Sequence, residues 1–361
     1  MIDLSKIAKK LKATLADDIE DSPDMTSTGN LAFDLIIDGG MPFGHVVELL
    51  GLSASGKSTI VQKIIATAQK KYGAVSVLID RENAFFKPRA KELGVDTKNL
   101  ILVKPKDTPG VSSAYAFVID TVTTIRAQDK EIAIAAAKNE KAKEAIRKTD
   151  KYKRTHIVIA IDSVAAFESD VDLGKSDSGR KAQQHHAGLR KILSVIDEQM
   201  MCVVTNHVTW KIGIVFGDKK STTAGESYKY YGTVRCSLEE KRIIVAPEMN
   251  NEPIGTWVRV EVIKTRLGPC YRSCVMPLFY KDPIPYYGGI ARLLVDRNIM
   301  KPTNADEFKK FKSHTVTYKG EKVNEFEMEA FLAKHPEIDL SKYPEYNVEK
   351  GGKKELTNKE E

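Results

Sequence analysis

The distribution of apolar and polar residues predicts a protein built on buried parallel strands. Four mainly apolar runs stand along the chain, at residues 46–50, 75–79, 157–161 and 201–204, and polar side chains follow each of them. Runs without alternation are typical of parallel strands that helices cover on both faces. In such proteins, residues at the carboxyl ends of the strands line ligand sites. The pattern therefore predicts an α/β protein with a mostly parallel sheet.

Helical and antiparallel patterns flank these runs. In residues 1–22, Leu4, Ile7, Leu11 and Leu15 stand at helical spacing, which predicts an amphipathic helix. Its apolar stripe covers either a neighbouring subunit or its own domain, and the pattern alone does not decide between them. Residues 231–235 and 257–266 alternate or run apolar, so we expect the sheet to end in antiparallel strands.

The run at 46–50 leads into a loop that reads G-x-x-x-x-G-K-S. A strand before this loop and a helix after it direct backbone N–H groups and a helix N-terminus at phosphates. In such a loop Lys57 reaches the β- and γ-phosphates, and the Ser58 hydroxyl binds Mg²⁺. The predicted nucleotide-binding residues are Gly51, Leu52, Ser53, Ala54, Ser55, Gly56, Lys57, Ser58 and Thr59.

Composition and charge add a few limits. The 361 residues are 42% hydrophobic and 29% charged, which is ordinary for a soluble protein. No apolar run approaches the roughly 18 residues of a membrane span, and no signal peptide opens the chain, so we expect a cytoplasmic protein without membrane contacts. A net charge of +7 is compatible with a polyanionic partner. The four cysteines lack metal-site spacing and are expected to be reduced.

Several ordered segments resemble one known family. Residues 28–34 and 39–48, the phosphate loop, and the segment Asp80-Arg81-Glu82-Asn83-Ala84 are similar to the RecA/RadA strand-exchange recombinases, above all to the bacterial and phage branch. The resemblance covers about residues 26–276. It implies a RecA-like P-loop ATPase core with a mostly parallel central sheet flanked by helices, preceded by an N-terminal helix and followed by a small C-terminal α/β domain.

The resemblance also implies a function. Members of this family act in DNA recombination and repair: they form helical filaments on single-stranded DNA, pair it with homologous double-stranded DNA, and hydrolyse ATP with Mg²⁺. Single-strand-binding and loading proteins are further expected partners. The implied domains are an oligomerisation helix and linker at 1–28, the ATPase core at 29–276, the C-terminal domain at 277–346 and a disordered tail at 347–361.

By the same resemblance, roles pass to individual residues. Glu82 is the base that activates water, and Asp162, which ends the run at 157–161, holds Mg²⁺ opposite Ser58. Arg89 stands where bacterial members usually have an adenine-stacking tyrosine, and a guanidinium also stacks on bases. His207 stands where the family has a glutamine that senses the γ-phosphate; unlike glutamine, histidine side chains change charge near neutral pH. The alternative for Glu82 is a helix-capping or surface carboxylate, and the alternative for His207 is a structural histidine.

The resemblance places two DNA-binding loops at about 168–184 and 208–225. Residues 168–184 show no apolar periodicity and are expected to be a loop, with Arg180, and Arg190 in the helix after it, as DNA contacts. The second loop mixes lysines, hydroxyl residues and apolar side chains that suit phosphates and base steps. Its expected DNA-binding residues are Lys211, Ile214, Val215, Phe216, Lys219, Lys220, Thr222, Thr223 and Gly225.

Lys264 and Arg266 correspond to a Lys-x-Lys pair of the family, which reaches into the neighbouring subunit's nucleotide pocket and stabilises charge there as an arginine finger does. Surface charges on an edge strand would give the same pattern. Residues 126–156 carry ten Lys or Arg against five Asp or Glu. We expect a solvated helix or hairpin there, with a secondary DNA contact as the alternative.

The same motifs are compatible with two other functions. A hexameric helicase or translocase motor of the RecA type shares the phosphate loop and Glu82, and would displace strands without forming a D-loop. A regulatory filament protein would bind DNA but hydrolyse ATP slowly.

Overall fold

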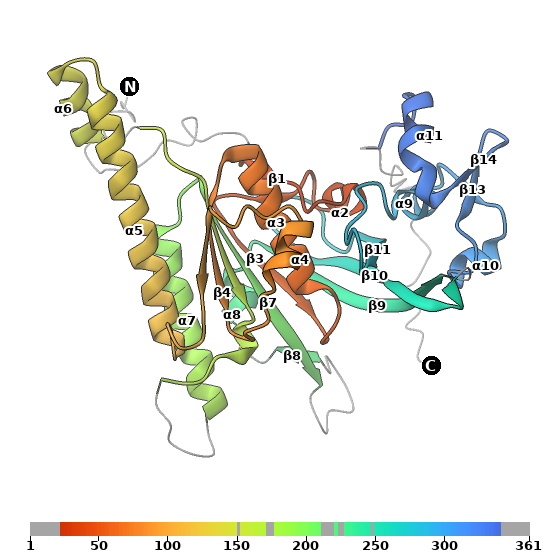
Figure 1. Ribbon diagram of the computed structural model, residues 1–361, viewed down its shortest axis with the longest axis horizontal. Helices are drawn as coiled ribbons and strands as arrows, with labels where there is room; N and C mark the ends of the chain where they lie inside the picture. Colours follow the sequence, from red (N-terminus) through yellow and green to blue (C-terminus); the bar gives the residue numbers. More distant parts are fainter. Residues whose placement is uncertain are drawn as a thin grey trace, which may run out of the picture.

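The computed structural model describes residues 22–149, 152–170, 177–210, 220–222, 227–246 and 249–340. Within these residues a nine-stranded sheet has the order β11-β10-β9-β3-β7-β6-β4-β5, with β8 attached to β7 (Figure 1). The strands are β3 (Val46–Gly51), β4 (Val75–Asp80), β5 (Leu100–Val103), β6 (Ile157–Asp162), β7 (Met200–Trp210), β8 (Lys220–Thr222), β9 (Val234–Ala246), β10 (Glu252–Thr265) and β11 (Ser273–Phe279).

Most neighbouring strands are parallel, as the apolar runs predict. Strands β5, β4, β6, β7, β3 and the first part of β9 pair in parallel, whereas β10 is antiparallel to both β9 and β11. The predicted antiparallel end is therefore confirmed. One boundary differs, because residues 227–231 form the short helix α8 (Ser227–Tyr231) and the strand begins only at Val234.

Helices cover both faces of the sheet (Figure 1). One face carries α2 (Leu31–Ile36) and α3 (Lys57–Tyr72), and the other carries α5 (Val111–Ala136) and α7 (Asp177–Val195), with α6 (Glu140–Thr149) against α5. The helix α4 (Lys87–Glu92) follows β4. Two apolar clusters result, one on each face, which explains why the strand sequences are apolar without alternation.

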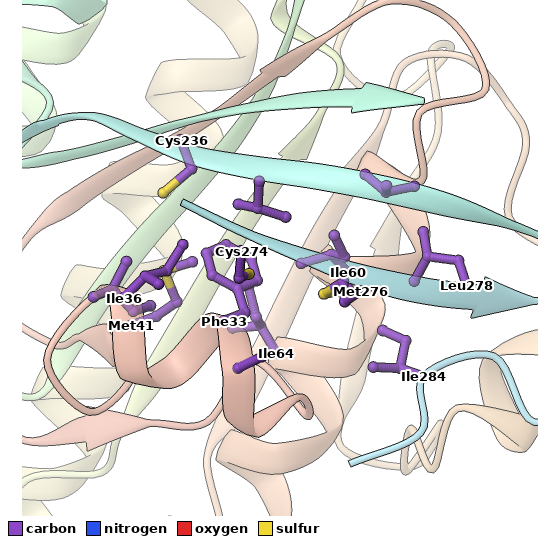
Figure 2. Close-up of a cluster of buried hydrophobic side chains, with 14 of the residues drawn as sticks. Phe33, Ile36, Met41, Ile60, Ile64, Cys236, Cys274, Met276, Leu278 and Ile284 are labelled. Atoms are coloured by element: carbon purple, nitrogen blue, oxygen red, sulfur yellow. The ribbon is translucent and has the colours of Figure 1, made fainter. Parts of the chain in front are cut away.

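The cluster around α2 and α3 continues under the antiparallel strands. Figure 2 shows Phe33, Ile60 and Ile64 from the helices beside Cys274 and Met276 of β11. The same cluster extends into the C-terminal region through buried apolar residues such as Leu293 and Phe331. The C-terminal region is therefore packed on the sheet through a continuous apolar core.

The C-terminal region begins inside a strand. The predicted boundary at residues 276 and 277 falls within β11, which continues to Phe279. Beyond it lie a three-stranded sheet and short helices, as an α/β segment requires. They are α9 (Ile290–Asp296), β12 (Lys301–Pro302), α10 (Ala305–Lys309), β13 (Thr315–Tyr318), β14 (Glu321–Asn324), η4 (Glu325–Glu327) and α11 (Met328–Lys334).

The segment predicted as a loop at 168–184 is partly helical. Helix α7 already begins at Asp177, and its early residues Gly179, Arg180 and Gln183 are exposed. A helix that is solvated in its first turns shows no apolar stripe there, so the pattern did not reveal it. The basic stretch 126–156 contains the end of α5 and all of α6, in agreement with the helical prediction.

Some predictions fall outside the described residues. These are the N-terminal helix up to residue 21 and the tail at 347–361. Across the part of the chain that is described, no helix has both the length and the apolarity needed to cross a membrane.

Candidate functional site

A polar cavity lies where the carboxyl ends of β3, β4, β6 and β7 meet. Its volume is about 230 Å³. Parallel strands bring their carboxyl ends to one edge of the sheet, which is where α/β proteins bind ligands. The residues that line it are Ser53, Ala54, Ser55, Gly56, Lys57, Ser58, Thr59, Glu82, Asp162 and His207. The structure thus brings together most of the loop residues and three side chains that the sequence places far apart.

The loop between β3 and α3 depends on two glycines. Gly56 is the residue before α3 and has φ of 84°, in the left-handed region. A Cβ atom on Gly56 would lie 2.1 Å from Leu278 Cδ1, and one on Gly51 would lie 2.4 Å from Ser55 Oγ. Any side chain at these positions would therefore displace the loop from the packing that positions its backbone.

Lys57 is folded back over the loop. Its Nζ donates to the carbonyl oxygens of Gly51, at 3.1 Å, and Leu52, at 2.7 Å. Burial lowers the pKa of the Lys57 ammonium, and the nearby carboxylates of Asp162 and Glu82 oppose this shift. The cavity therefore holds a cation close to two acidic side chains, at the N-terminus of α3.

Asp162 lies at the end of β6, where burial raises the pKa of its carboxyl group. Hydrogen bonds from Ser58 and Thr205 favour the ionised form and oppose that shift. The Thr205 hydroxyl donates to Asp162 Oδ1 at 2.5 Å. The carboxylate and the Ser58 hydroxyl are thus held side by side, as the sequence motifs suggested.

Glu82 follows β4 and is held by two partners. Ser163 Oγ donates to Glu82 Oε1 at 2.7 Å, and His207 Nε2 lies 3.1 Å from the same oxygen. Burial alone would raise the pKa of Glu82, but these hydrogen bonds, together with the charges of His207 and Lys57, lower it overall. The Glu82 side chain is 39% exposed, so its carboxylate is ionised, oriented and open to solvent.

Strand β7 organises the cavity with three successive side chains, two of which the sequence analysis missed. Thr205 donates to Asp162 and His207 contacts Glu82, while Asn206 Nδ2 donates to Glu48 Oε1 at 2.8 Å. The fully buried Glu48 also accepts from Arg235 Nε at 2.5 Å. A glutamate inside an apolar run was the available sequence signal for this buried ion pair.

Three of the predicted residues lie elsewhere. Arg89 in α4 donates to the backbone carbonyls of Phe279 and Tyr280 at the end of β11. Lys264 Nζ and Arg266 donate to the carbonyl of Tyr230 in α8, at 3.2 and 2.9 Å. None of the three lines the cavity described above.

Four of the predicted DNA-binding residues lie in the described part of the chain. Arg180 and Arg190 are exposed on α7. Lys220 and Thr222 belong to β8, which pairs with Val208–Trp210 of β7 as an antiparallel hairpin. The others lie outside the described residues: Lys211, Ile214, Val215, Phe216, Lys219, Thr223 and Gly225.

The donor set of the cavity fits a phosphate chain with a magnesium ion. An ammonium group, four hydroxyl side chains and the N-terminus of α3 attract phosphate oxygens. The Asp162 carboxylate and the Ser58 hydroxyl are the hard oxygen ligands that Mg²⁺ prefers. Glu82 lies beside them. Its carboxylate bonds to Ser163 and His207, whereas Lys57 bonds to oxygen atoms of the loop.

Comparison with known proteins agrees with this geometry. The family model of the RecA N-terminal domain matches residues 4–127 and 128–285. The protein RecA of Citrifermentans bemidjiense is 30% identical over 326 residues, which cover 88% of this chain and 83% of the relative. The protein RecA of Roseiflexus castenholzii is 31% identical over 288 residues, covering 78% and 71%. Both the matching domain and the relatives span most of the described fold, so the chain belongs to the RecA family of recombinases.

Proposed function

We propose that this RecA-type recombinase binds ATP in the strand-end cavity, assembles into a filament on single-stranded DNA, and pairs that strand with homologous duplex DNA. The observation that carries this proposal is the convergence of the phosphate loop, Glu82, Asp162 and His207 on one cavity. Family membership supplies the DNA-dependent ATPase activity at the level of the family.

One group of cavity residues binds the nucleotide and its metal ion. In this group, Lys57 and the backbone N–H groups at the start of α3 bind phosphate oxygens, while Ser58 and Asp162 hold Mg²⁺. The ion, when bound, neutralises charge on the phosphates. Thr205 keeps the Asp162 carboxylate oriented through its 2.5 Å hydrogen bond.

Glu82 is the proposed base. Its lowered pKa keeps the carboxylate ionised and able to accept a proton from water. Ser163 and His207 both bond to Oε1, which orients the carboxylate and leaves Oε2 available for water. Because His207 also precedes the hairpin of β7 and β8, it links the state of Glu82 to the second proposed DNA loop.

Lys264 and Arg266 complete the site from a neighbouring subunit in this proposal. Their present partners are backbone carbonyls of α8, and both side chains are partly or fully exposed. Cations that lie away from their own cavity suit a role in the next one along a filament. Arg89 of α4, which donates to carbonyls at the end of β11, is proposed to contact the adenine of ATP.

DNA contacts are proposed for both loops. For the first, Arg180 within the predicted loop and Arg190 in the helix after it present exposed cations on α7. The hairpin of β7 and β8 brings the second loop out from the strand that carries Thr205, Asn206 and His207. The second DNA loop and the nucleotide cavity thus share one strand.

Electron microscopy tests the proposal most directly. We expect helical filaments when the protein is mixed with single-stranded DNA and a non-hydrolysable ATP analogue, and none without nucleotide. Addition of homologous supercoiled duplex with ATP should give D-loops. A protein that remains monomeric with every nucleotide, or that displaces strands without forming D-loops, would overturn the proposal; the second result would favour a translocase.

A further inference from the structure

A continuous set of buried contacts leaves the nucleotide cavity on the side of α5 and α7. It consists of five side chains, which we call the relay: Arg81, Phe167, His185, Tyr115 and Tyr228. All five are at most 9% exposed. They come from five different elements or connections, so the relay joins side chains that lie far apart in the sequence.

The relay starts next to the proposed base. Arg81 precedes Glu82, and its backbone N–H donates to the carbonyl of Asp162 at 2.7 Å. Its guanidinium donates to the carbonyls of the connection at 105–109 and lies 4.6 Å from the centre of the Phe167 ring. Arg81 therefore links the backbone beside Glu82 and Asp162 to Phe167 through a side chain that three carbonyls hold in place.

Phe167 stands at the entrance of the first proposed DNA loop. It follows the short helix η2 (Val164–Ala166) and directly precedes residue 168. Its ring lies 5.7 Å from the ring of His185 in α7, the helix in which that loop ends. Lys181 Nζ also donates to the carbonyl of Ala165 at 2.8 Å, so both ends of the loop are tied together.

The relay then crosses to α8 by two hydrogen bonds. Tyr115 Oη of α5 lies 3.1 Å from His185 Nδ1 and 2.6 Å from Tyr228 Oη. Burial and the charge of Lys181 lower the pKa of His185 to about 4, so its ring is neutral and Nδ1 can accept from Tyr115. Tyr115 can then accept from Tyr228, and both hydroxyl groups are satisfied.

A glycine in α7 allows α5 and α7 to pack closely beside Tyr115. A Cβ atom on Gly188 of α7 would lie 2.2 Å from Cδ2 of the Tyr115 ring. The close packing of α5 against α7 at this point therefore requires glycine. The tyrosine is held against His185 without room to move sideways.

The last member of the relay belongs to the helix that supports the proposed interface cations. Tyr228 is in α8, just after the second proposed DNA loop. The carbonyls of Lys229 and Tyr230 in the same helix accept from Lys264 Nζ at 2.5 and 3.2 Å. A shift of α8 therefore moves the cations that we assign to the neighbouring subunit's site.

We propose that the relay positions both DNA loops and α8 relative to Glu82 and Asp162, so that DNA binding accelerates ATP hydrolysis through these five side chains. This inference rests on the proposed function. The relay residues act through the catalytic groups and not on the substrate. Buried hydrogen-bonded networks with discrete packing arrangements are suited to such coupling.

The test removes the two tyrosine hydroxyl groups of the relay one at a time. Tyr228→Phe and Tyr115→Phe each remove one relay hydroxyl and keep the ring. We expect the stimulation of ATP hydrolysis by single-stranded DNA to fall about fivefold in each, within the range by which coupling residues act. DNA-free hydrolysis and the KM for ATP should remain at the wild-type value. The double variant should lose little more than Tyr115→Phe alone, because that substitution already removes the bond between the two hydroxyl groups.

Tyr231→Phe is the matched control. Tyr231 also links α8 to α7, through His186 Nε2 at 2.9 Å, but at an exposed position where water replaces the lost hydroxyl. Its stimulation should equal that of the wild type. His185→Phe, which keeps an aromatic ring against Phe167, provides a second test if a tyrosine variant fails to fold, as judged by its melting temperature.

The outcomes separate the two proposals. A wild-type protein whose hydrolysis DNA does not accelerate would overturn the proposed function itself. A stimulated wild type with equally stimulated Tyr228→Phe, Tyr115→Phe and His185→Phe variants would overturn the relay alone. A parallel loss of DNA-free and DNA-stimulated hydrolysis would show that the cluster only stabilises the fold, and would also overturn it.

Discussion

Polar side chains at the two ends of the central sheet have different hydrogen-bond partners. At the parallel end, Glu82, Asp162 and His207 bond to side chains of adjacent strands around an open cavity. At the antiparallel end, Lys264 and Arg266 bond to main-chain carbonyls of α8, outside that cavity. Both ends carry ionisable side chains, but of these five residues only Glu82, Asp162 and His207 line a common cavity.

The difference indicates which end is complete within one chain. Side chains that position one another form a site that can orient a ligand before it arrives. Cations that rest on carbonyls at the surface gain little stability from those contacts. They are therefore available to a second molecule, and the comparison predicts a site divided between two subunits.

The largest expected effect tests this division. Replacing Lys264 and Arg266 together with alanine should lower DNA-dependent ATP hydrolysis about 10³-fold or more, as loss of an arginine finger does. Nucleotide binding, measured by equilibrium titration of the single protein, should remain. Cations that act only within their own subunit would give the same loss, so a mixing experiment is needed.

Mixing with a Glu82→Gln variant distinguishes the two cases. Each variant alone is inactive, but a random mixed filament contains interfaces with an intact Glu82 and intact cations. About a quarter of the wild-type activity should return in an equimolar mixture if the interface is heterologous. A mixture as inactive as its components would show that the antiparallel end does not serve a neighbouring cavity.

Glu82→Gln alone tests the parallel end. We expect hydrolysis to fall about 10²–10³-fold with and without DNA, because the amide cannot accept the proton from water. ATP-dependent binding of single-stranded DNA should persist, since Lys57, Ser58 and Asp162 are unchanged. Fluorescence anisotropy with a labelled oligonucleotide measures it. Hydrolysis near the wild-type rate would leave Glu82 as a surface carboxylate.

His207→Ala addresses the link between the cavity and the hairpin. We expect it to reduce the DNA stimulation of hydrolysis about tenfold, a usual size for a coupling between two sites. Nucleotide binding should survive, because the substitution removes the side chain that contacts Glu82 and keeps the backbone that pairs with Gly51 of the phosphate loop. His207→Gln, which keeps a hydrogen-bonding side chain, is the matched control. Unchanged stimulation in the alanine variant would reduce His207 to a structural residue.

The sequence predicts the surroundings of the cavity better than it predicts contacts between distant elements. The strands around the cavity are recognisable because each is buried on both faces and has a continuous apolar sequence. The phosphate loop is local in the sequence, so its glycines and Lys57 identify it directly. That Asp162 and Glu82 line the same cavity follows from the shared direction of β4 and β6.

Contacts that depend on register or on helix packing were not predictable. The pair of Glu48 and Arg235 joins residues 187 positions apart and requires β9 to lie beside β3. His185 was assigned no role, because the turns of α7 before it are solvated and give no apolar pattern. Its partner Tyr115 is 70 positions away on another helix.

The smallest expected effect concerns the stability of the C-terminal region, which packs on the antiparallel strands. Glu325 is 1% exposed and accepts from the backbone N–H of Gly289 at 2.7 Å. Burial raises the pKa of Glu325 from 4.5 to about 7, although the charge of Arg292 and nearby backbone N–H groups oppose this. Unlike Glu82, this carboxyl group is expected to be structural, and its substitution should leave hydrolysis unchanged.

A raised pKa sets the sign of the pH dependence. Between pH 4.5 and about 7 the folded chain retains a proton on Glu325 that the unfolded chain has released, so stability falls as pH rises through this window. The loss should amount to about 1–3 kcal/mol. Glu325→Gln cannot ionise, so its free energy of unfolding relative to the wild type should increase from pH 5 to pH 8 in urea titrations. Glu329→Gln, at an exposed position in α11, is the control and should track the wild type. Parallel curves for Glu325→Gln and the wild type would mean that burial does not hold this carboxyl group in its neutral form.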